Sequence, residues 1–339
     1  MNNVFVYCEI EDGHVADVSL ELLTKGRSLA NQIGTKLEAI AIGHDLKGIE
    51  KSIFPYGVDV LHVADNKSLA PFRTLPHVAV VKEVFKKEQP EIALFGATSA
   101  GRDLAPRIAS ALECGLTADC TSLEIGDHFD KKANKEYQNI LYQIRPAFGG
   151  NIIATIINPE TRPQLATVRE GVMRKEETSA SYQGEVKAVD VKKILTPEME
   201  AVKIIERHIE KSKVNIKNAG IIIAGGYGVG SKQNFDLLYE LADVLGGDVG
   251  ASRAAVDAGY ASHERQIGQT GITVRPKLYI ACGISGQVQH TAGMEESAMV
   301  ISINTDKEAP ISKIADYAIV GDVSEVVPRI IASYKKNSK

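Results

Sequence analysis

The sequence predicts an α/β protein of two domains, each built around a parallel sheet. Three observations support this prediction. Strand-like apolar runs alternate with helical segments through the first hundred residues, the same alternation begins again near residue 218, and a polar stretch separates the two series. Strands that alternate with helices form parallel sheets with helices on their faces. The 339 residues are enough for two such domains.

The first domain is predicted from apolar runs rich in Val, Ile, Leu and Ala. These runs are residues 3–10, 36–43, 58–65 and 91–98. Residues 19–34, which follow the first run, have the apolar spacing of a helix. We therefore expect an N-terminal parallel sheet of the Rossmann-like, nucleotide-hydrolase-like kind.

An antiparallel extension of this domain is predicted after residue 120. Apolar runs come close together there, with turn residues between them: 121–126, 139–149, 151–159 and 164–173. Strands separated by short turns commonly pair in antiparallel fashion, because a tight turn reverses the chain.

The domain boundary is expected in the weakest part of the apolar pattern. The stretch EETSASYQGEVKAVDVKK, which begins at residue 176, is polar and offers little to a core. Boundaries between domains fall in such exposed segments. We therefore predict a first domain over 1–205, with a link from about 176, and a second domain over 206–339.

The second domain begins with the strand NAGIIIAGG (218–226) and a helix over 234–247. That helix has an apolar stripe and Gly246 near its end. Three further strands are predicted: 278–283, 298–304 and 317–322. Ligands of open parallel sheets bind beyond the carboxyl ends of the strands. This rule nominates the following residues for a pocket rim: Gly225, Gly226, Ser285, Asn304 and Asp322.

The composition excludes several classes of protein. The formal net charge is −4, which gives no reason to expect a nucleic-acid or anionic-membrane partner. No apolar run approaches the roughly 20 residues that span a bilayer, and MNNVFVYCEI lacks the features of a secretory signal. The four cysteines form no C-x-x-C pair, and Cys114 and Cys120 have no matching Cys/His pair. We expect a cytoplasmic protein with no membrane insertion and no metal site.

Two glycine-rich turns resemble known motifs only in part. In GGYGVGSK (225–232), Gly225 and Gly230 have P-loop spacing, but Ser231 and Lys232 stand in the wrong order. The stretch also lacks the dinucleotide pattern G-x-G-x-x-G, so it predicts either a plain tight turn or a weak anion site. ACGISGQVQH (281–290) lacks the G-x-S-x-G spacing of a serine hydrolase. It predicts a turn with exposed amides, suited to pyrophosphate, with His290 on the helix that follows.

The stretches GASRAAVDAG (250–259) and QIGQTG (266–271) bring together one permanent cation, Arg253, and several neutral donors. They contain no nucleophile–base pair and no carboxylate dyad, so hydrolysis is not favoured. The set suits an aromatic cofactor that gains negative charge. A flavin fits, because its reduced forms carry charge near N1 and the C2 carbonyl, where a nearby cation raises the potential.

These stretches also carry a resemblance to a known family. VGASRAAVDAG, QIGQTG, PKLYIACGISGQVQHTAGM, SINTDKEAPI and ADYAIVGD resemble the FAD domain of electron-transfer flavoprotein α subunits. RPAFGGNIIATIINPETRPQLATVREGVM (145–173) is similar to the N-terminal domain of the same family. The resemblance covers nearly the whole chain and implies a C-terminal FAD-binding domain.

The resemblance implies roles for individual residues. Arg253 lies beside the isoalloxazine ring and stabilises its reduced forms, Thr270 hydrogen-bonds near N5, and His290 approaches the N1/C2 carbonyl side. The other residues implied to contact the cofactor are Ser252, Gln266, Ile267, Gly268 and Gln269 around the ring, Ser285, Gly286, Gln287, Val288 and Gln289 along the ribityl and pyrophosphate, and Asn304, Asp322 and Val323 at the adenosine end. Tyr227 stands where many relatives have Arg, which leaves its contact in doubt.

The resemblance also implies partners. It implies a heterodimer with an electron-transfer flavoprotein β subunit and an FAD domain that swings between partners. The polar link near 176–205 fits a hinge for this motion on physical grounds, since few contacts need to break there. The stretch VADVSLELLTKGRSLANQIG (15–34) resembles the NADH-oxidising, electron-bifurcating branch. In that branch electrons pass from a β-subunit flavin to ferredoxin or flavodoxin and, through the α-subunit FAD, to an acyl-CoA dehydrogenase.

Three alternatives stay open at this point. The chain could serve a non-bifurcating carrier that passes electrons from dehydrogenases to a quinone reductase. It could be a nucleotide-binding regulatory module, because the first domain resembles ATP- and AMP-binding folds. It could also be an NAD-using enzyme, because the strand pattern of the second domain is shared with NAD-binding folds.

Overall fold

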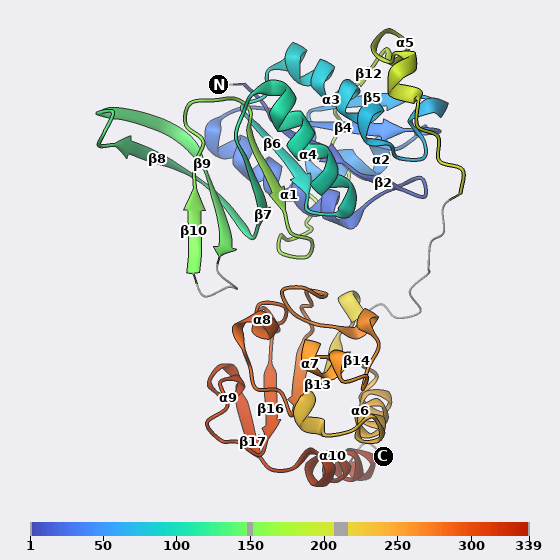
Figure 1. Cartoon of the computed structure of the whole chain (residues 1–339), viewed down its shortest axis with the longest axis vertical. Coiled ribbons are helices and arrows are strands. Elements are labelled where there is room, and N and C mark those ends of the chain that lie inside the picture. Colours follow the sequence, from blue (N-terminus) through green and yellow to red (C-terminus); the bar gives the residue numbers. More distant parts are fainter. Residues whose placement is uncertain (1, 148–151, 207–215, 338–339) are drawn as a thin grey trace. The chain divides into compact units, whose positions relative to one another are not determined.

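The computed structural model describes residues 2–147, 152–206 and 216–337. These residues fall into two compact units, 2–147 with 152–206, and 216–337 (Figure 1). Residues 148–151, which touch two of the predicted strand runs, and 207–215, at the start of the predicted second domain, lie outside the described residues. Within the described ranges, no helix combines the length and the apolar character needed to cross a bilayer.

The first unit is built on a parallel sheet with strand order β12-β5-β4-β1-β6-β11-β7. Its strands are β1 (Val4–Cys8), β4 (Leu37–Gly43), β5 (Val60–Asp65), β6 (Ile92–Gly96), β7 (Leu116–Cys120), β11 (Gln164–Val168) and β12 (Glu185–Ala188). The main helices are α1 (Asp17–Ile33), α3 (Thr74–Glu88) and α4 (Ser99–Leu112). Shorter elements are β2 (Ile10–Glu11), β3 (His14–Val15), α2 (Glu50–Ile53), η1 (Phe54–Tyr56), η2 (Lys67–Leu69), α5 (Val191–Ile194) and η4 (Pro197–Glu200).

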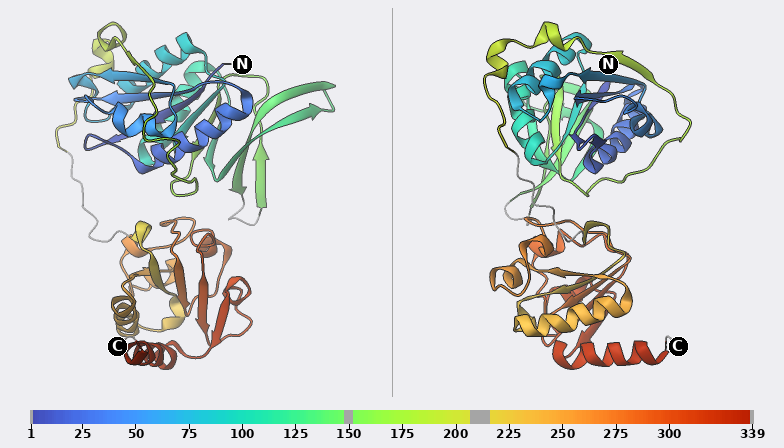
Figure 2. Two further views of the ribbon diagram at one scale, coloured as in Figure 1. Left: turned by 180° about the vertical axis from the view of Figure 1, so that it is seen from behind. Right: turned by 90° about the vertical axis from the view of Figure 1, so that its right-hand side faces the viewer.

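Helices cover both faces of this sheet (Figure 2). Along β1, Val4 and Val6 pack in the core with Leu22 of α1, whereas Phe5 and Tyr7 pack with α3 and α4 on the other face. Successive side chains of a strand point to opposite faces, so a doubly covered strand must be apolar throughout. This explains the continuous apolar runs of the sequence and confirms the predicted α/β class.

The antiparallel extension is formed by β8 (Ser122–Asp130), β9 (Lys135–Ala147) and β10 (Ile152–Ile156). These strands pair in the order β10-β9-β8 and extend away from the parallel sheet (Figure 1). The run 164–173 was also expected in this extension, and that expectation is wrong. It supplies β11, which pairs in parallel between β6 and β7 and is buried along its whole length.

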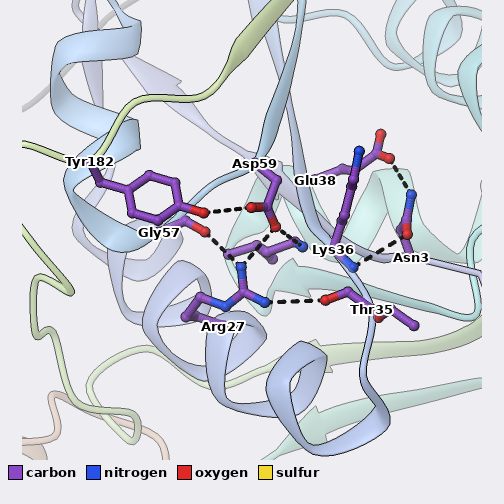
Figure 3. A network of polar contacts seen from close by, with 9 residues as sticks. Asn3, Arg27, Thr35, Lys36, Glu38, Gly57, Asp59 and Tyr182 are labelled. Carbon is purple, nitrogen blue, oxygen red and sulfur yellow. Dashed lines mark hydrogen bonds and ion pairs between the residues drawn. The ribbon is translucent and has the colours of Figure 1, made fainter.

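The polar stretch that begins at residue 176 belongs to the first unit, so the link predicted from there is wrong over much of its length. β12 pairs in parallel with β5 at the edge of the sheet. Tyr182 donates a hydrogen bond to Asp59, whose other carboxylate oxygen accepts from Arg27 at 2.8 Å (Figure 3). The backbone N–H of Thr178 also donates to the carbonyl of Pro55 at 2.8 Å. Hydrogen bonds to the rest of the unit therefore hold a segment that has too few apolar residues to pack as core.

The second unit has a parallel sheet with strand order β14-β13-β15-β16-β17. The strands are β13 (Ile221–Gly225), β14 (Asp248–Ala251), β15 (Leu278–Cys282), β16 (Val300–Asn304) and β17 (Tyr317–Val320). The helices are α6 (Lys232–Leu245), α7 (Arg253–Asp257), α8 (Val288–Thr291), α9 (Ile311–Ile314) and α10 (Val323–Asn337), with the short turns η5 (Ile216–Asn218), η6 (Tyr227–Val229) and η7 (His263–Arg265).

The two faces of this second sheet are covered differently. α6 and α10 pack Leu238 and Val327 against strand residues such as Ile223 on one face. On the other face, Tyr279 of β15 packs against loop residues such as Val274. α6 begins where Ser231 accepts a hydrogen bond from the N–H of Asn234, and it ends at Gly246 in the left-handed region, as its sequence predicts. Helices and loops thus cover the two faces of the sheet, and the loops at the carboxyl ends of the strands lie at its edge.

Candidate functional site

A cavity of about 680 Å³ lies at the carboxyl ends of the strands of the second unit. It is lined by eleven of the predicted cofactor residues: Ser252, Arg253, Gln266, Ile267, Gly268, Thr270, Ser285, Gln287, Gln289, His290 and Asn304. The fold thus joins loops that follow β13, β14, β15 and β16. Parallel strands place their carboxyl ends at one edge of the sheet, so residues far apart in sequence meet there.

The turn over residues 225–232 has a structural role. A Cβ on Gly226 would lie 2.1 Å from the carbonyl oxygen of Gly283, so this position requires glycine. The N–H groups of Gly226 and Gly228 donate to the carbonyls of Cys282 and Gly283, at 2.8 and 3.0 Å. Because these amides have protein acceptors, the turn is a tight backbone contact with the loop after β15. This geometry supports the plain-turn alternative over the weak anion site.

Arg253 is the first residue of α7. The Ser252 side chain caps this helix, and the Ser252 N–H donates to the carbonyl of Gly225 at 2.9 Å, which fixes the start of the helix beside β13. The Arg253 side chain is 70% exposed, and its Nε lies 3.5 Å from the carboxylate of Asp257. An exposed pair of this kind binds weakly. The guanidinium is therefore available to a ligand in the cavity that it lines.

The loop 266–271 presents a hydroxyl to the cavity. Gln266 is buried, and its Nε2 donates to the Thr270 hydroxyl at 3.1 Å. Thr270 accepts in this bond, so its own O–H remains to be donated. The loop is held on the start of α8, since the N–H of Gln269 donates to the carbonyl of Gln289 at 2.6 Å. Gln269 thus serves the loop through its backbone, and its side chain is not among the residues that line the cavity.

His290 is buried and has protein partners at both ring nitrogens. Nδ1 lies 3.1 Å from the carbonyl oxygen of Ile267, and Nε2 lies 2.9 Å from the hydroxyl of Tyr279. A carbonyl only accepts, so Nδ1 carries the proton and Nε2 accepts from Tyr279. Burial lowers the pKa of His290 to about 4. The ring lines the cavity as a group whose two nitrogens already have protein partners.

Of the three residues implied to contact the adenosine end of FAD, one lines the cavity. Asn304 lines the cavity and donates to the carbonyl of Ile284 at 2.9 Å. Asp322 instead accepts from the Ser324 hydroxyl at 2.6 Å and from the Ser324 backbone N–H at 2.8 Å, at the start of α10, and these two bonds lower its pKa. Val323 is a buried first residue of that helix. Asp322 and Val323 therefore act in the helix start, and the cavity is lined by neither.

Gly286 and Val288 are also outside the lining. Gly286 lies so close to α9 that a Cβ would be 2.3 Å from the N of Ile311. This glycine lets the turn that carries Ser285 and Gln287 pack against the next loop.

Several lining residues escaped the sequence analysis: Ala254, Asp257, Ile284, Asp306, Ala309 and Pro310. They lie in the stretches that carry the family resemblance, but the resemblance was not read as giving these six residues a contact of their own. Tyr227 also lines the cavity, and its ring stacks on Tyr260 with centroids 6.0 Å apart.

The residues fit a flavin nucleotide. The apolar wall, which includes Ile267 and Ile284, suits a flat ring system, and Arg253 and Thr270 offer a cation and a donor. At Gly226 and Gly268, a Cβ would collide with neighbouring backbone, so the loops pack closely around the space. The described lining residues include no carboxylate beside a nucleophile, so the site suits binding and charge stabilisation.

Comparison with known proteins agrees with this geometry. The family model of the electron transfer flavoprotein domain matches residues 4–194 of the sequence. The family model of the electron transfer flavoprotein FAD-binding domain matches residues 215–295.

Similar proteins align over nearly the whole chain. An electron transfer flavoprotein subunit alpha of Thermoanaerobacterium thermosaccharolyticum is 44% identical over 98% of both chains. Protein FixB of Clostridium saccharobutylicum is 49% identical over 98% of this chain and 96% of its own. Subunit LctC of a lactate dehydrogenase (NAD(+),ferredoxin) of Acetobacterium woodii is 39% identical over 97% of this chain and 76% of its own. The chain therefore belongs to the electron transfer flavoprotein family as an α subunit, and its second unit is the FAD-binding domain of that family.

Proposed function

We propose that this chain carries the FAD of a heterodimeric electron carrier and exchanges single electrons between a flavin in the β subunit and a dehydrogenase partner. The observation that carries the proposal is the position of Arg253. Among the described residues that line the cavity, it is the one fixed cation, and neutral donors surround it. Such a set stabilises negative charge on a bound aromatic group without acting as an acid or a base.

The residues of the chain divide this work. FAD, when bound, supplies the one-electron chemistry. Arg253 holds a positive charge at the wall of the cavity, and Thr270 presents its O–H. His290 stays neutral because its environment keeps its pKa near 4, so it adds no second positive charge. The affinity for electrons is therefore controlled by Arg253.

The electron donor is proposed to be NADH, acting through the flavin of the β subunit in a bifurcating complex. This proposal rests on the resemblance of residues 15–34 and on the lactate dehydrogenase (NAD(+),ferredoxin) name of one relative. In such a complex, ferredoxin or flavodoxin takes one electron, and an acyl-CoA dehydrogenase takes the other through this chain. A non-bifurcating carrier that feeds a quinone reductase uses the same cavity and is the alternative.

The proposed place of action is the cytoplasm. The four cysteines are free, and burial raises the pKa values of Cys8 and Cys120. Cysteines left unpaired in this way suit a reducing compartment.

The test uses the full chain purified together with an electron-transfer flavoprotein β subunit from the same organism. We expect a yellow complex whose α-subunit FAD is reduced by NADH only when the β subunit is present. Adding ferredoxin should change the number of electrons delivered to an acyl-CoA dehydrogenase per NADH if the complex bifurcates. A colourless chain that does not bind added FAD would contradict the whole proposal, whereas a ferredoxin-independent yield would leave the non-bifurcating carrier.

A further inference from the structure

A second cavity, of about 560 Å³, lies in the first unit and is separate from the FAD site. It sits at the carboxyl ends of β1, β4 and β6, where β4 and β5 lie on one side of β1 and β6 lies on the other. Open parallel sheets bind ligands at this reversal of strand order. The walls include Tyr7, Ile42, Leu69, Phe72 and His77, so the interior is largely apolar.

The charge of this cavity disfavours a phosphate-bearing ligand. Glu9 is buried, and its carboxylate accepts from the Thr98 hydroxyl at 2.7 and 2.8 Å. Thr98 caps α4, and one Glu9 oxygen lies 3.3 Å from the place a Cβ on Gly101 would take. A carboxylate of the chain thus occupies the helix start where a phosphate would bind, and Glu11 and Asp12 add acid to the lining. This argues against the nucleotide-binding regulatory module.

One residue of the cavity lining comes from the segment that follows η4. We call residues 201–206 the strap. Its apolar side chains are unequally exposed: Val202 is 65% exposed, Ile204 is 41% exposed and Ile205 is 98% exposed. Within the strap, Ile204 is the residue that lines the cavity. Three large apolar side chains within six surface residues indicate a segment that packs against another surface, and one of them, Ile204, already lines the cavity.

A hydrogen bond holds the strap beside the cavity. Nη1 of Arg73 donates to the carbonyl of Val202 at 2.8 Å, and Nη2 of Arg73 donates to the carbonyl of Ser68. Arg73 directly precedes α3, and Ser68 belongs to η2, so the guanidinium joins the strap to two elements at the cavity rim.

We propose that the cavity of the first unit is the docking site of the strap, with Ile204 as the apolar anchor and Arg73 as the clasp. Release of the strap frees six residues from the first unit, which is about 20 Å of extended chain at roughly 3.3–3.6 Å per residue. Docking therefore sets how far the FAD-binding domain can move. This last consequence rests on the proposed function, whereas the docking itself does not.

The test measures motion at position 203 in the full FAD-loaded chain. A nitroxide label is attached to Lys203→Cys in a chain with Cys114→Ser, since the other cysteines are buried. The expected spectrum is dominated by an immobile component. Ile204→Ser should raise the ratio of mobile to immobile label roughly tenfold, because a half-buried isoleucine is lost from the cavity. Ile205→Ser is the matched control and should leave the ratio unchanged, because this neighbour is 98% exposed.

Two further variants act from the other side of the contact. Ala100→Phe places a bulky ring in the cavity lining and should mobilise the label as Ile204→Ser does. Arg73→Ala should mobilise it less, by roughly threefold, since one hydrogen bond is lost. Equal spectra for Ile204→Ser and Ile205→Ser, or a label that is mobile in the parent chain, would overturn the proposal. So would an unchanged label in Ala100→Phe, which would show that the strap does not use the cavity. None of these results bears on FAD binding, so the proposed function stands or falls separately.

Discussion

The two cavities of the chain occupy the same topological position and differ in the charged groups that line them. Each lies at the carboxyl ends of parallel strands, and each contains a buried histidine held between a tyrosine and a carbonyl. In the first unit, His77 lies 2.9 Å from the Tyr7 hydroxyl and 3.0 Å from the Leu69 carbonyl oxygen. In the second, His290 lies 2.9 Å from the Tyr279 hydroxyl and 3.1 Å from the Ile267 carbonyl oxygen.

The fixed charges of the two linings differ, whereas their histidines do not. Burial lowers the pKa of both histidines to about 4, so neither contributes a charge near neutral pH. Arg253 adds a permanent cation to the second cavity, beside Asp257 and Asp306, whereas the described lining of the first has Glu9, Glu11 and Asp12 and no Lys or Arg. The comparison teaches that the fold supplies the position of a site, while a fixed cation in its lining favours a negatively charged cofactor there.

The largest expected effect comes from filling the backbone contact of the second cavity. Gly226→Ala places a Cβ 2.1 Å from the backbone oxygen of Gly283. A backbone carbonyl cannot rotate out of the way as a flexible side chain can, so the loops must shift. We expect a loss of about 3 kcal/mol in the stability of the second unit and failure to retain FAD. Flavin absorbance after gel filtration and hydrogen exchange of β13 measure the two losses.

Gly220→Ala is the control for that experiment. Gly220 precedes β13 in the same unit, and nothing lies within 4 Å of its added Cβ. The control should retain FAD. Normal FAD retention in Gly226→Ala would mean that the two loops do not pack as closely as the structure has them.

Removing the fixed cation of the second cavity should lower the flavin potential. Arg253→Ala removes the fixed cation, which stabilises the reduced, negatively charged flavin by about 1–3 kcal/mol, judging from charge-assisted contacts. For one electron this corresponds to a potential lower by about 40–130 mV, since a tenfold change equals 59 mV. Arg253→Lys keeps a charge and should retain part of the potential. Spectroscopic redox titration makes the measurement, and equal potentials for the parent and Arg253→Ala would remove Arg253 from its role.

Lowering the pH should affect the stability of the two units differently. The pKa values of His77 and His290 are lowered from 6.5 to about 4, so the unfolded chain binds each proton first, and stability is lost as the pH falls from 6.5 towards 4. Burial raises the pKa of Glu9 from 4.5 to about 7, so the folded chain binds that proton first, and stability is gained as the pH falls from 7 towards 4.5. The two effects oppose each other in the first unit.

The second unit has the histidine without a buried acid to compensate among the cavity residues described. It should lose about 2 kcal/mol between about pH 7.5 and about pH 5, while the first unit changes little. Hydrogen exchange of β13 and β1 at the two pH values tests this. Glu9→Gln should make the first unit acid-sensitive as well, and equal acid sensitivity of both units in the parent chain would refute the assignment.

The smallest expected effect comes from the shared tyrosine–histidine arrangement. Tyr279→Phe and Tyr7→Phe each leave a buried histidine nitrogen without its donor, at a cost of about 1–2 kcal/mol in the unit concerned. The flavin potential should stay near its parent value in Tyr7→Phe, because Tyr7 lies in the other cavity. Thermal unfolding with and without FAD checks both variants, and a potential shift in Tyr7→Phe would show coupling between the cavities.

The stretches that line the cavity could be picked out of the sequence because each is a short loop after a strand, whereas the roles of single residues came from the family resemblance. Arg253 follows a strand and a small-residue turn, and the loop 266–271 carries its own donors, so sequence neighbours became neighbours in the cavity. Distant partners decide the rest of the geometry. Asp322, which the resemblance implies as a cofactor contact, accepts a hydrogen bond at the start of α10, and His290 is held by Tyr279 and Ile267.

The sequence by itself determined the α/β class, the two series of strands and helices, the glycine turns and the fixed cation of the second unit. These features depend on the periodicity of apolar residues and on residue chemistry, which are local properties. The tertiary structure alone decided that 164–168 enters the parallel sheet, that β12 joins its edge, and that both histidines are neutral. Strand partners and burial arise from contacts between residues far apart in the chain, and a polar segment such as 176–190 takes its place through partners that its own sequence does not contain.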